Sequence, residues 1–159
     1  MKRAAAFILF IALAFSGSAI ALGNPDFSGT WALDLDKSDT GQGRPSAMAA
    51  KAQKVILFIK QTPTALATTR KMGERSETST EKLDGSESVN KSPSGQDIKS
   101  TNRWEGSTLV TKSIMPAGQG NVESSFVRSL SADGKVMTID MTMKTPSGVS
   151  KKKLIYNKQ

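Results

Sequence analysis

The acidic side chains come closest to a catalytic arrangement in this chain. Glycoside hydrolysis needs only two carboxylates and no histidine, and two pairs supply them: Glu77 with Glu81, and Glu105 with Glu123. The spacing singles out neither pair. Glu77 and Glu81 lie on one face of a very polar segment, where we expect exposure to solvent. We therefore predict no catalytic residues.

A second acidic group, Asp34-x-Asp36-x-Ser38, begins like a calcium-binding loop. Such a loop requires Gly at its sixth position and Glu at its twelfth. These positions hold Asp39 and Pro45, which excludes an EF-hand. A looser calcium site formed by Asp34, Asp36 and Asp39 stays a hypothesis beside the simpler interpretation of a solvated strand end, and we predict no bound metal.

The chain of 159 residues contains no His and no Cys. This composition excludes Ser-His-Asp triads, thiol nucleophiles, and zinc or haem sites built from these residues. The length is that of a single domain. We predict a protein that is not an enzyme and that holds no cofactor.

Basic residues outnumber acidic ones, with 22 Lys and Arg against 14 Asp and Glu. They are spread along the chain, Arg70 and Arg128 among them, and the one run is Lys151–Lys153. A nucleic-acid surface interleaves aromatic residues with such charges, and Tyr156 alone stands near the run, so we predict no nucleic-acid partner. Attraction to an anionic surface, such as lipid headgroups or envelope polymers, is one hypothesis. A soluble basic surface that protects edge strands is the alternative.

Residues 1–21 have the order of a secretory signal peptide. Lys2 and Arg3 precede an apolar run over residues 4–15, and Ala19-Ile20-Ala21 offers a small-residue cleavage site. The run is shorter than the roughly 20 residues of a spanning helix, although an uncleaved anchor stays an alternative. We predict export to the periplasm or the medium, and one mature domain over residues 22–159.

Beyond Pro25 the chain shows no long helical periodicity, and short alternating or β-branched runs recur between turn residues. This pattern is typical of an antiparallel all-β protein. The predicted strands are Gly29–Leu35, Lys54–Gln61, Ala65–Met72, Ser76–Leu83, Asp97–Trp104, Thr108–Met115, Asn121–Leu130, Lys135–Lys144 and Val149–Lys158, with a short tenth near Glu87–Lys91.

Tight turns such as Asp84-Gly85 and Asp133-Gly134 make successive strands neighbours. An open sheet of this size leaves two exposed edges, so we predict a closed antiparallel up-and-down barrel of about 8–10 strands. The irregular segment Asp36–Met48, followed by a possible short helix over Ala47–Lys54, is either a lid over one barrel end or a solvated connection.

Strand alternation predicts which side chains face the interior. The candidates are Trp31, Leu33 and Leu35 on the first strand, Val55, Leu57 and Ile59 on the second, and Met137, Ile139, Met141 and Met143 near the end. The segments 76–83 and 97–104 carry few apolar residues. The interior is therefore expected to be partly wet, and either hollow or filled.

The opening of the mature chain, with Gly29-x-Trp31 inside Asp26–Trp31, resembles the N-terminal signature of lipocalins and the wider calycin group of barrels. Leu33-Asp34 and Ser131–Lys135 narrow the similarity to small secreted bacterial lipocalin-like proteins. The resemblance covers about 130 residues and implies that Gly29 and Trp31 are structural, with Trp31 closing one barrel end. It also implies a basic side chain across the Trp31 ring, a place that Lys151 or Lys153 would take.

Two functions are consistent with this sequence. The first, which the resemblance favours, is noncatalytic binding of a small apolar or amphipathic molecule, with Leu57, Ile59, Trp104, Met137 and Met141 as the candidate binding residues. The second is an interaction module with a filled core, which acts through its outer face on an envelope protein, as periplasmic barrel-shaped protease inhibitors do. Its contact segments would be Leu22–Phe27 and Asp36–Met48, and in either case we expect a monomer.

Overall fold

The computed structural model describes residues 23–41, 54–118 and 120–159. Within these ranges the chain forms the strands β1 (Gly29–Leu33), β2 (Val55–Gln61), β3 (Ala65–Met72), β4 (Arg75–Lys82), β5 (Ser88–Lys91), β6 (Asp97–Glu105), β7 (Thr108–Ala117), β8 (Gly120–Leu130), β9 (Val136–Thr145) and β10 (Gly148–Lys158). The all-β prediction is confirmed, and the short strand expected near Glu87–Lys91 is present as β5. The described ranges contain no helix long and apolar enough to cross a membrane.

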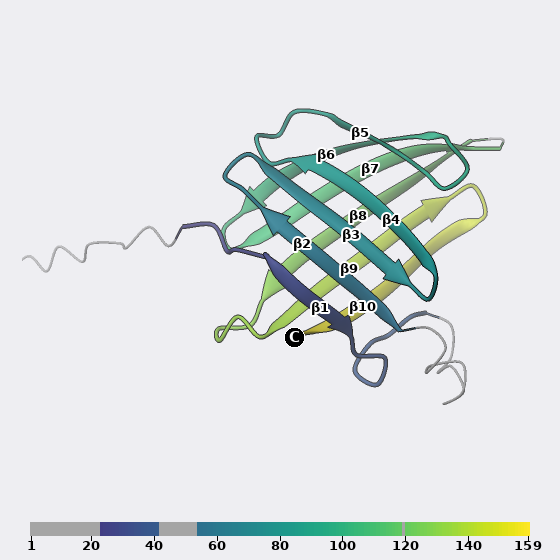
Figure 1. The fold of residues 1–159 in the computed structure, drawn as a ribbon. Helices are drawn as coiled ribbons and strands as arrows, with labels where there is room; N and C mark the ends of the chain where they lie inside the picture. The colour runs from purple at the N-terminus through teal and green to yellow at the C-terminus, as the bar shows by residue number, and fades with distance from the viewer. Residues whose placement is uncertain (1–22, 42–53, 119) are drawn as a thin grey trace, which may run out of the picture.

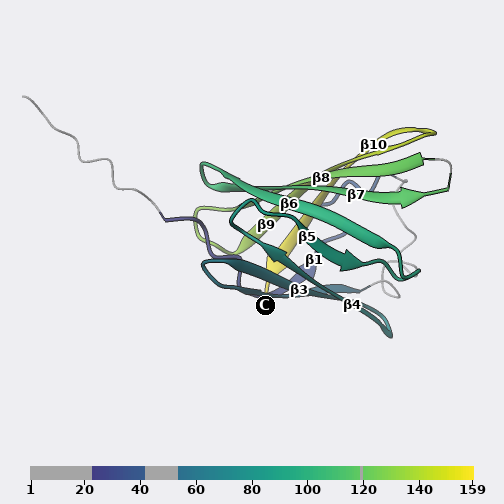
Figure 2. The same ribbon diagram turned by 90° about the horizontal axis from the view of Figure 1, so that it is seen from above.

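All strands belong to one antiparallel sheet in the order β4-β3-β2-β1-β10-β9-β8-β7-β6-β5. Most neighbours are consecutive hairpins, and the pairing of β1 with β10 brings the first and last strands together. Figure 1 shows the sheet curled into a barrel, and Figure 2 shows β6, β7 and β8 facing β3 and β4 across it. The interior lies between these two layers.

The barrel is nearly closed rather than fully closed, because β4 and β5 do not pair through their backbones. Side chains join them instead. The Asn90 amide accepts a hydrogen bond from the Thr80 N–H (2.9 Å) and donates one to the Thr80 carbonyl (3.1 Å), as a peptide of a neighbouring strand does. The Ser88 hydroxyl accepts from the Lys82 N–H at 2.8 Å. These bonds satisfy backbone groups that an open edge would leave unpaired.

The predicted inward faces of the apolar strands are confirmed. Val55, Leu57 and Ile59 alternate as buried residues along β2, and Met137 and Ile139 do so on β9. The densest packing lies at the barrel end where the chain enters, because the largest fully buried hydrophobic side chains gather there. They are Phe27, Trp31, Leu66, Leu109 and Met137.

Trp31 is completely buried in this packed end. Its Nε1–H donates a hydrogen bond to the Phe27 carbonyl at 2.8 Å. The prediction that Lys151 or Lys153 crosses its ring is wrong: Lys158 Nζ lies 5.2 Å from the ring centroid. The reason is register, since Trp31 pairs directly with Lys158 on β10, whereas Lys151 and Lys153 pair with β9 farther along the strand.

Gly29 precedes this contact with a φ of 136°, a conformation that side chains rarely adopt. A Cβ atom built there would lie 2.9 Å from Cε of Lys158. We predict that Gly29→Ala lowers the free energy of unfolding by about 1–3 kcal/mol, because alanine is strained at this φ. Urea titration measures the loss.

Gly23→Ala is the matched control for this substitution. Gly23 has no atom within 4 Å of its built Cβ and no positive φ, so the unfolding midpoint of that variant should match the wild type. A Gly29→Ala protein as stable as Gly23→Ala would contradict the assigned backbone strain.

Asp34 organises the loop after β1 instead of joining a carboxylate cluster. Its side chain accepts hydrogen bonds from the Asn157 amide (3.0 Å) and from the Lys37 N–H (3.2 Å), and these bonds lower the pKa of the carboxyl below 3.8. The described residues contain no group of three or more acidic side chains arranged for a metal ion. The predicted signal segment, most of the predicted lid and the predicted short helix lie outside the described residues.

Candidate functional site

The half of the barrel away from Trp31 holds a cavity of about 1340 Å³ among the described residues, and this cavity is open to solvent. The boundary between core and cavity runs across the strands: on β1 it falls between Trp31 and Leu33, and on β9 between Met137 and Ile139. Ligand pockets commonly have volumes of about 300–1,000 Å³, so this space exceeds an ordinary packing defect. The hypothesis of a filled core is wrong for the described part of the chain.

One wall of the cavity is apolar. It comes from the inward faces of β1–β3 and β8–β10, where Leu, Met, Val, Ile and Phe side chains alternate with outward residues. The wall consists of Leu33, Leu35, Val55, Leu57, Met72, Phe126, Ile139, Met141, Met143 and Leu154. Three methionines give this surface flexible, polarisable side chains that adapt to irregular shapes.

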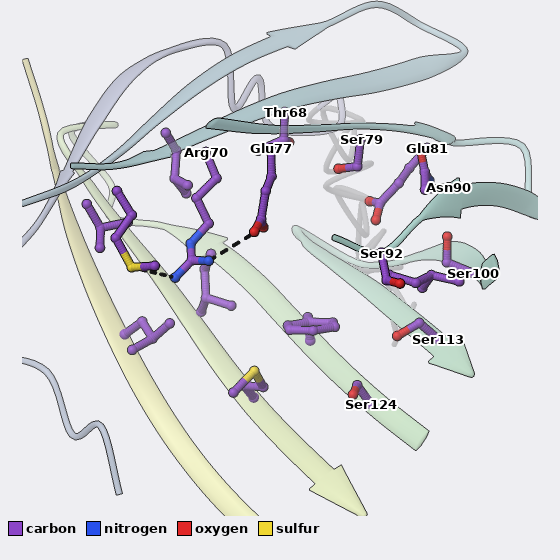
Figure 3. Close-up of a pocket in the computed structure, with 18 of the residues that line it drawn as sticks. Thr68, Arg70, Glu77, Ser79, Glu81, Asn90, Ser92, Ser100, Ser113 and Ser124 are labelled. Atoms are coloured by element: carbon purple, nitrogen blue, oxygen red, sulfur yellow. Dashed lines mark hydrogen bonds and ion pairs between the residues drawn. The ribbon is translucent and has the colours of Figure 1, made fainter. Parts of the chain in front are cut away.

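The opposite wall carries most of the hydroxyl, amide and charged groups, which come from β4 to β8, and Ile98, Met115 and Val122 line the cavity among them. Its polar members are Glu77, Ser79, Glu81, Asn90, Ser92, Ser100, Ser113, Ser124 and Arg128. Figure 3 shows Glu81, Ser100 and Ser113 on the same side of the cavity, with the Arg70–Glu77 pair away from them. The expectation of a partly wet interior on segments 76–83 and 97–104 agrees with this wall, and the cavity as a whole is amphipathic.

The deepest charges of the polar wall form an ion pair between Arg128 on β8 and Glu81 on β4. Arg128 Nη1 lies 3.5 Å from Glu81 Oε2, and the two side chains are only 12% and 13% exposed. Arg128 Nη1 also donates to the Thr111 hydroxyl at 3.4 Å, and Thr111 donates to Asn102 at 2.6 Å. The expectation that Glu81 faces solvent is wrong, because the face of β4 that carries Glu77, Ser79 and Glu81 lines the cavity.

A second ion pair lies nearer to solvent, where Arg70 Nη1 stands 3.7 Å from Glu77 Oε2. Both side chains are almost half exposed, so solvent screens their attraction. Both arginines line the cavity, and only Arg128 is withdrawn from the spread basic surface that the sequence suggested. Each interior arginine has a glutamate partner, and these four charges cancel.

Tyr156 on β10 also lines the cavity and is only 3% exposed. Burial raises the pKa of its hydroxyl above the ordinary value of 10.0, and the positive charges of Arg70 and Arg128 oppose the shift. The phenol is therefore neutral at physiological pH and can donate a hydrogen bond into the cavity.

Three buried polar atoms of the described chain have no hydrogen-bond partner: Glu81 Oε2, Ser100 Oγ and Arg128 Nε. All three belong to residues of the polar wall. Unpartnered buried polar atoms are uncommon and costly in folded proteins. Hydrogen bonding is therefore incomplete within the polar wall.

The structure separates the five predicted binding residues into two groups. Leu57 and Met141 line the cavity. Ile59 and Met137 do not line it, since both are buried in the packed core at the closed end. Trp104 also packs against that core, where its ring stacks on Phe27 with centroids 6.0 Å apart.

The sequence interpretation missed Arg70, Glu81, Arg128 and Tyr156 as interior residues. A usable signal was present, because Arg128 shares its strand face with Phe126 and alternation turns both inward. Charged residues were expected on the outer surface. This expectation fails where the interior of a barrel is hollow and lined by polar groups.

Solved structures with the same fold bind small molecules. The chain is 16% identical to the REP1-NXSQ fatty acid transporter, with a TM-score of 0.60 over 83% of this chain and 95% of that one. It is 18% identical to zebrafish ileal bile acid-binding protein solved with cholic acid (TM-score 0.61, 84% and 98% covered). It is 13% identical to apo lipid binding protein 8 of Caenorhabditis elegans (TM-score 0.62, 84% and 95% covered).

These likenesses support the fold, a ten-stranded, nearly closed antiparallel barrel. No protein-family model matches the chain, and no curated protein matches its sequence.

Proposed function

We propose that this chain is a noncatalytic, exported barrel that binds one small apolar or amphipathic molecule inside its cavity. The observation that carries the proposal is the cavity of about 1340 Å³ with an apolar wall facing a hydrogen-bonding wall. The three solved structures with this fold, named as fatty-acid, bile-acid and lipid binding proteins, support it. Export rests on the order of charged, apolar and small residues over 1–21.

A matched pair of tryptophan variants tests whether binding occurs in the cavity. Ser124 lines the cavity and Ser125, its neighbour on β8, does not. Ser124→Trp places an indole inside the space and should weaken binding of the uncharged fluorescent probe Nile red by about tenfold or more, because the probe loses contact area there. Ser125→Trp should leave the affinity unchanged.

Nile red fluorescence titration of both folded variants measures the effect. Equal affinities for Ser124→Trp, Ser125→Trp and the wild type would place the probe outside the barrel and contradict the proposal. Native mass spectrometry of the protein purified from its own host then identifies the natural molecule, which should appear as a reproducible small-molecule adduct on a single protomer.

A further inference from the structure

We infer that the polar group of the bound molecule is uncharged and carries hydroxyls, as in a monoacylglycerol, and is not a carboxylate. The inference rests on the proposed function and specifies its ligand class. It follows from the ion pairing inside the cavity, which leaves no interior arginine without an acidic partner among the described residues.

The Arg128–Glu81 pair is the most buried ion pair in the cavity wall. Both side chains are close to nine-tenths buried and lie 3.5 Å apart, so the guanidinium is neutralised before any ligand arrives. A carboxylate brought to Arg128 would also meet Glu81, and two like charges at such a distance repel strongly where water is scarce. A fatty-acid anion placed beside Arg128 would lose its hydration without gaining an unpaired guanidinium in return.

The unpartnered atoms show what the site accepts instead. Glu81 Oε2, which lies 3.5 Å from Arg128 Nη1, can accept a hydrogen bond, Arg128 Nε can donate one, and Ser100 Oγ can do either. A hydroxyl group both donates and accepts, so a hydroxyl-bearing headgroup suits such a wall without adding charge. The apolar wall across the cavity is then available to an acyl chain.

Two other cations line the cavity but do not change this conclusion. Lys91 is paired with Asp97 at 2.5 Å, and Lys152 runs beside Gly41, with its Cγ 3.6 Å from a Cβ built there. The Lys91–Asp97 pair is exposed, so it contributes only about 0–1 kcal/mol. Lys152 is a cation on β10 that takes no part in the buried Arg128–Glu81 pair. Discrimination between headgroups therefore depends on Glu81.

The test compares two ligands that share one chain length, laurate and 1-monolauroylglycerol, by displacement of Nile red at pH 8. The wild type should bind monolauroylglycerol about tenfold or more tightly than laurate, since unpaired buried polar groups discriminate strongly between ligands. Glu81→Gln removes the negative charge, keeps the shape and frees Arg128. This variant should bind laurate about tenfold more tightly than the wild type does, so that the preference disappears or reverses.

Glu123→Gln is the control, because Glu123 is exposed on β8 and outside the cavity wall, yet the substitution removes the same charge. Its ratio of affinities should equal that of the wild type. Laurate bound as tightly as monolauroylglycerol by the wild type would overturn the inference, and so would a ratio that Glu81→Gln leaves unchanged.

The wild-type ratio decides the question even if Glu81→Gln does not fold. A wild type that binds neither lipid nor Nile red would refute the proposed function itself. Binding of Nile red with no preference between the lipids would refute the headgroup inference alone.

Discussion

Trp31→Ala is expected to lower the free energy of unfolding by about 3–5 kcal/mol, the range for removing a large aromatic side chain from a core. Trp31 is 0% exposed and belongs to the core cluster with Phe27, Leu57 and Tyr156. The substitution removes the indole contacts, the hydrogen bond to the Phe27 carbonyl and the Lys158 contact together. Urea unfolding measures the loss, with the fluorescence of Trp104 as the remaining reporter.

Two milder substitutions measure separately how much the hydrogen bond to Phe27 and the Lys158 contact contribute to the free energy of unfolding. Trp31→Phe keeps an aromatic ring but leaves the buried Phe27 carbonyl without its donor, a change that costs about 1–3 kcal/mol. Lys158→Ala removes only the cation above the ring, which contributes about 0.5–1 kcal/mol at an exposed site. A Trp31→Ala protein that unfolds at the same urea concentration as Lys158→Ala would show that Trp31 does not close this end of the barrel.

Met137→Ala is expected to destabilise the protein by about 2–5 kcal/mol, because the lost atoms come from a fully packed region and leave a void. Met137 is 0% exposed and lies inside the core cluster. Once folded, the variant should bind Nile red as the wild type does, since Met137 is not part of the cavity wall. Urea titration and Nile red titration measure the two quantities.

Met141→Ala provides the matched comparison, with the same substitution on the same face of β9. Met141 borders a space that already exists, so its terminal atoms have fewer neighbours to lose. We expect a stability loss of less than half that of Met137→Ala and a measurable change in Nile red affinity. Similar stability losses at the two positions would mean that core and cavity are not separated as the structure places them.

The alternation of apolar residues was sufficient to predict the strands and the inward face of β2, β9 and β1. Strand periodicity is exactly two residues, so Val55, Leu57 and Ile59 must share one face whatever lies across the barrel. The polar residues of segments 76–83 and 97–104 likewise predicted a hydrophilic part of the barrel wall. Such patterns depend only on the local geometry of a strand, so they can be recognised in the sequence without knowledge of the partner strands.

Alternation does not say how far along the barrel a residue lies. Met137 and Met141 are equivalent by type, strand and face, and the sequence assigned both to binding. The structure places Met137 in the core and Met141 in the cavity wall. Met137 shares the core cluster with the large side chains Trp31, Leu66 and Leu109, whereas Met141 lines a cavity whose other lining residues include several small serines.

The sequence by itself determined the all-β class, the faces of the apolar strands and the hairpin order except at Asp84-Gly85, where β4 and β5 do not pair. Each of these features follows from periodicity and turn chemistry within a few residues. Only the tertiary structure decided which partners meet across the barrel. Register brought Lys158 to Trp31, and curvature brought Glu81 on β4 within 3.5 Å of Arg128 on β8. These contacts join strands far apart in the chain, and their geometry depends on the closure and twist of the whole sheet.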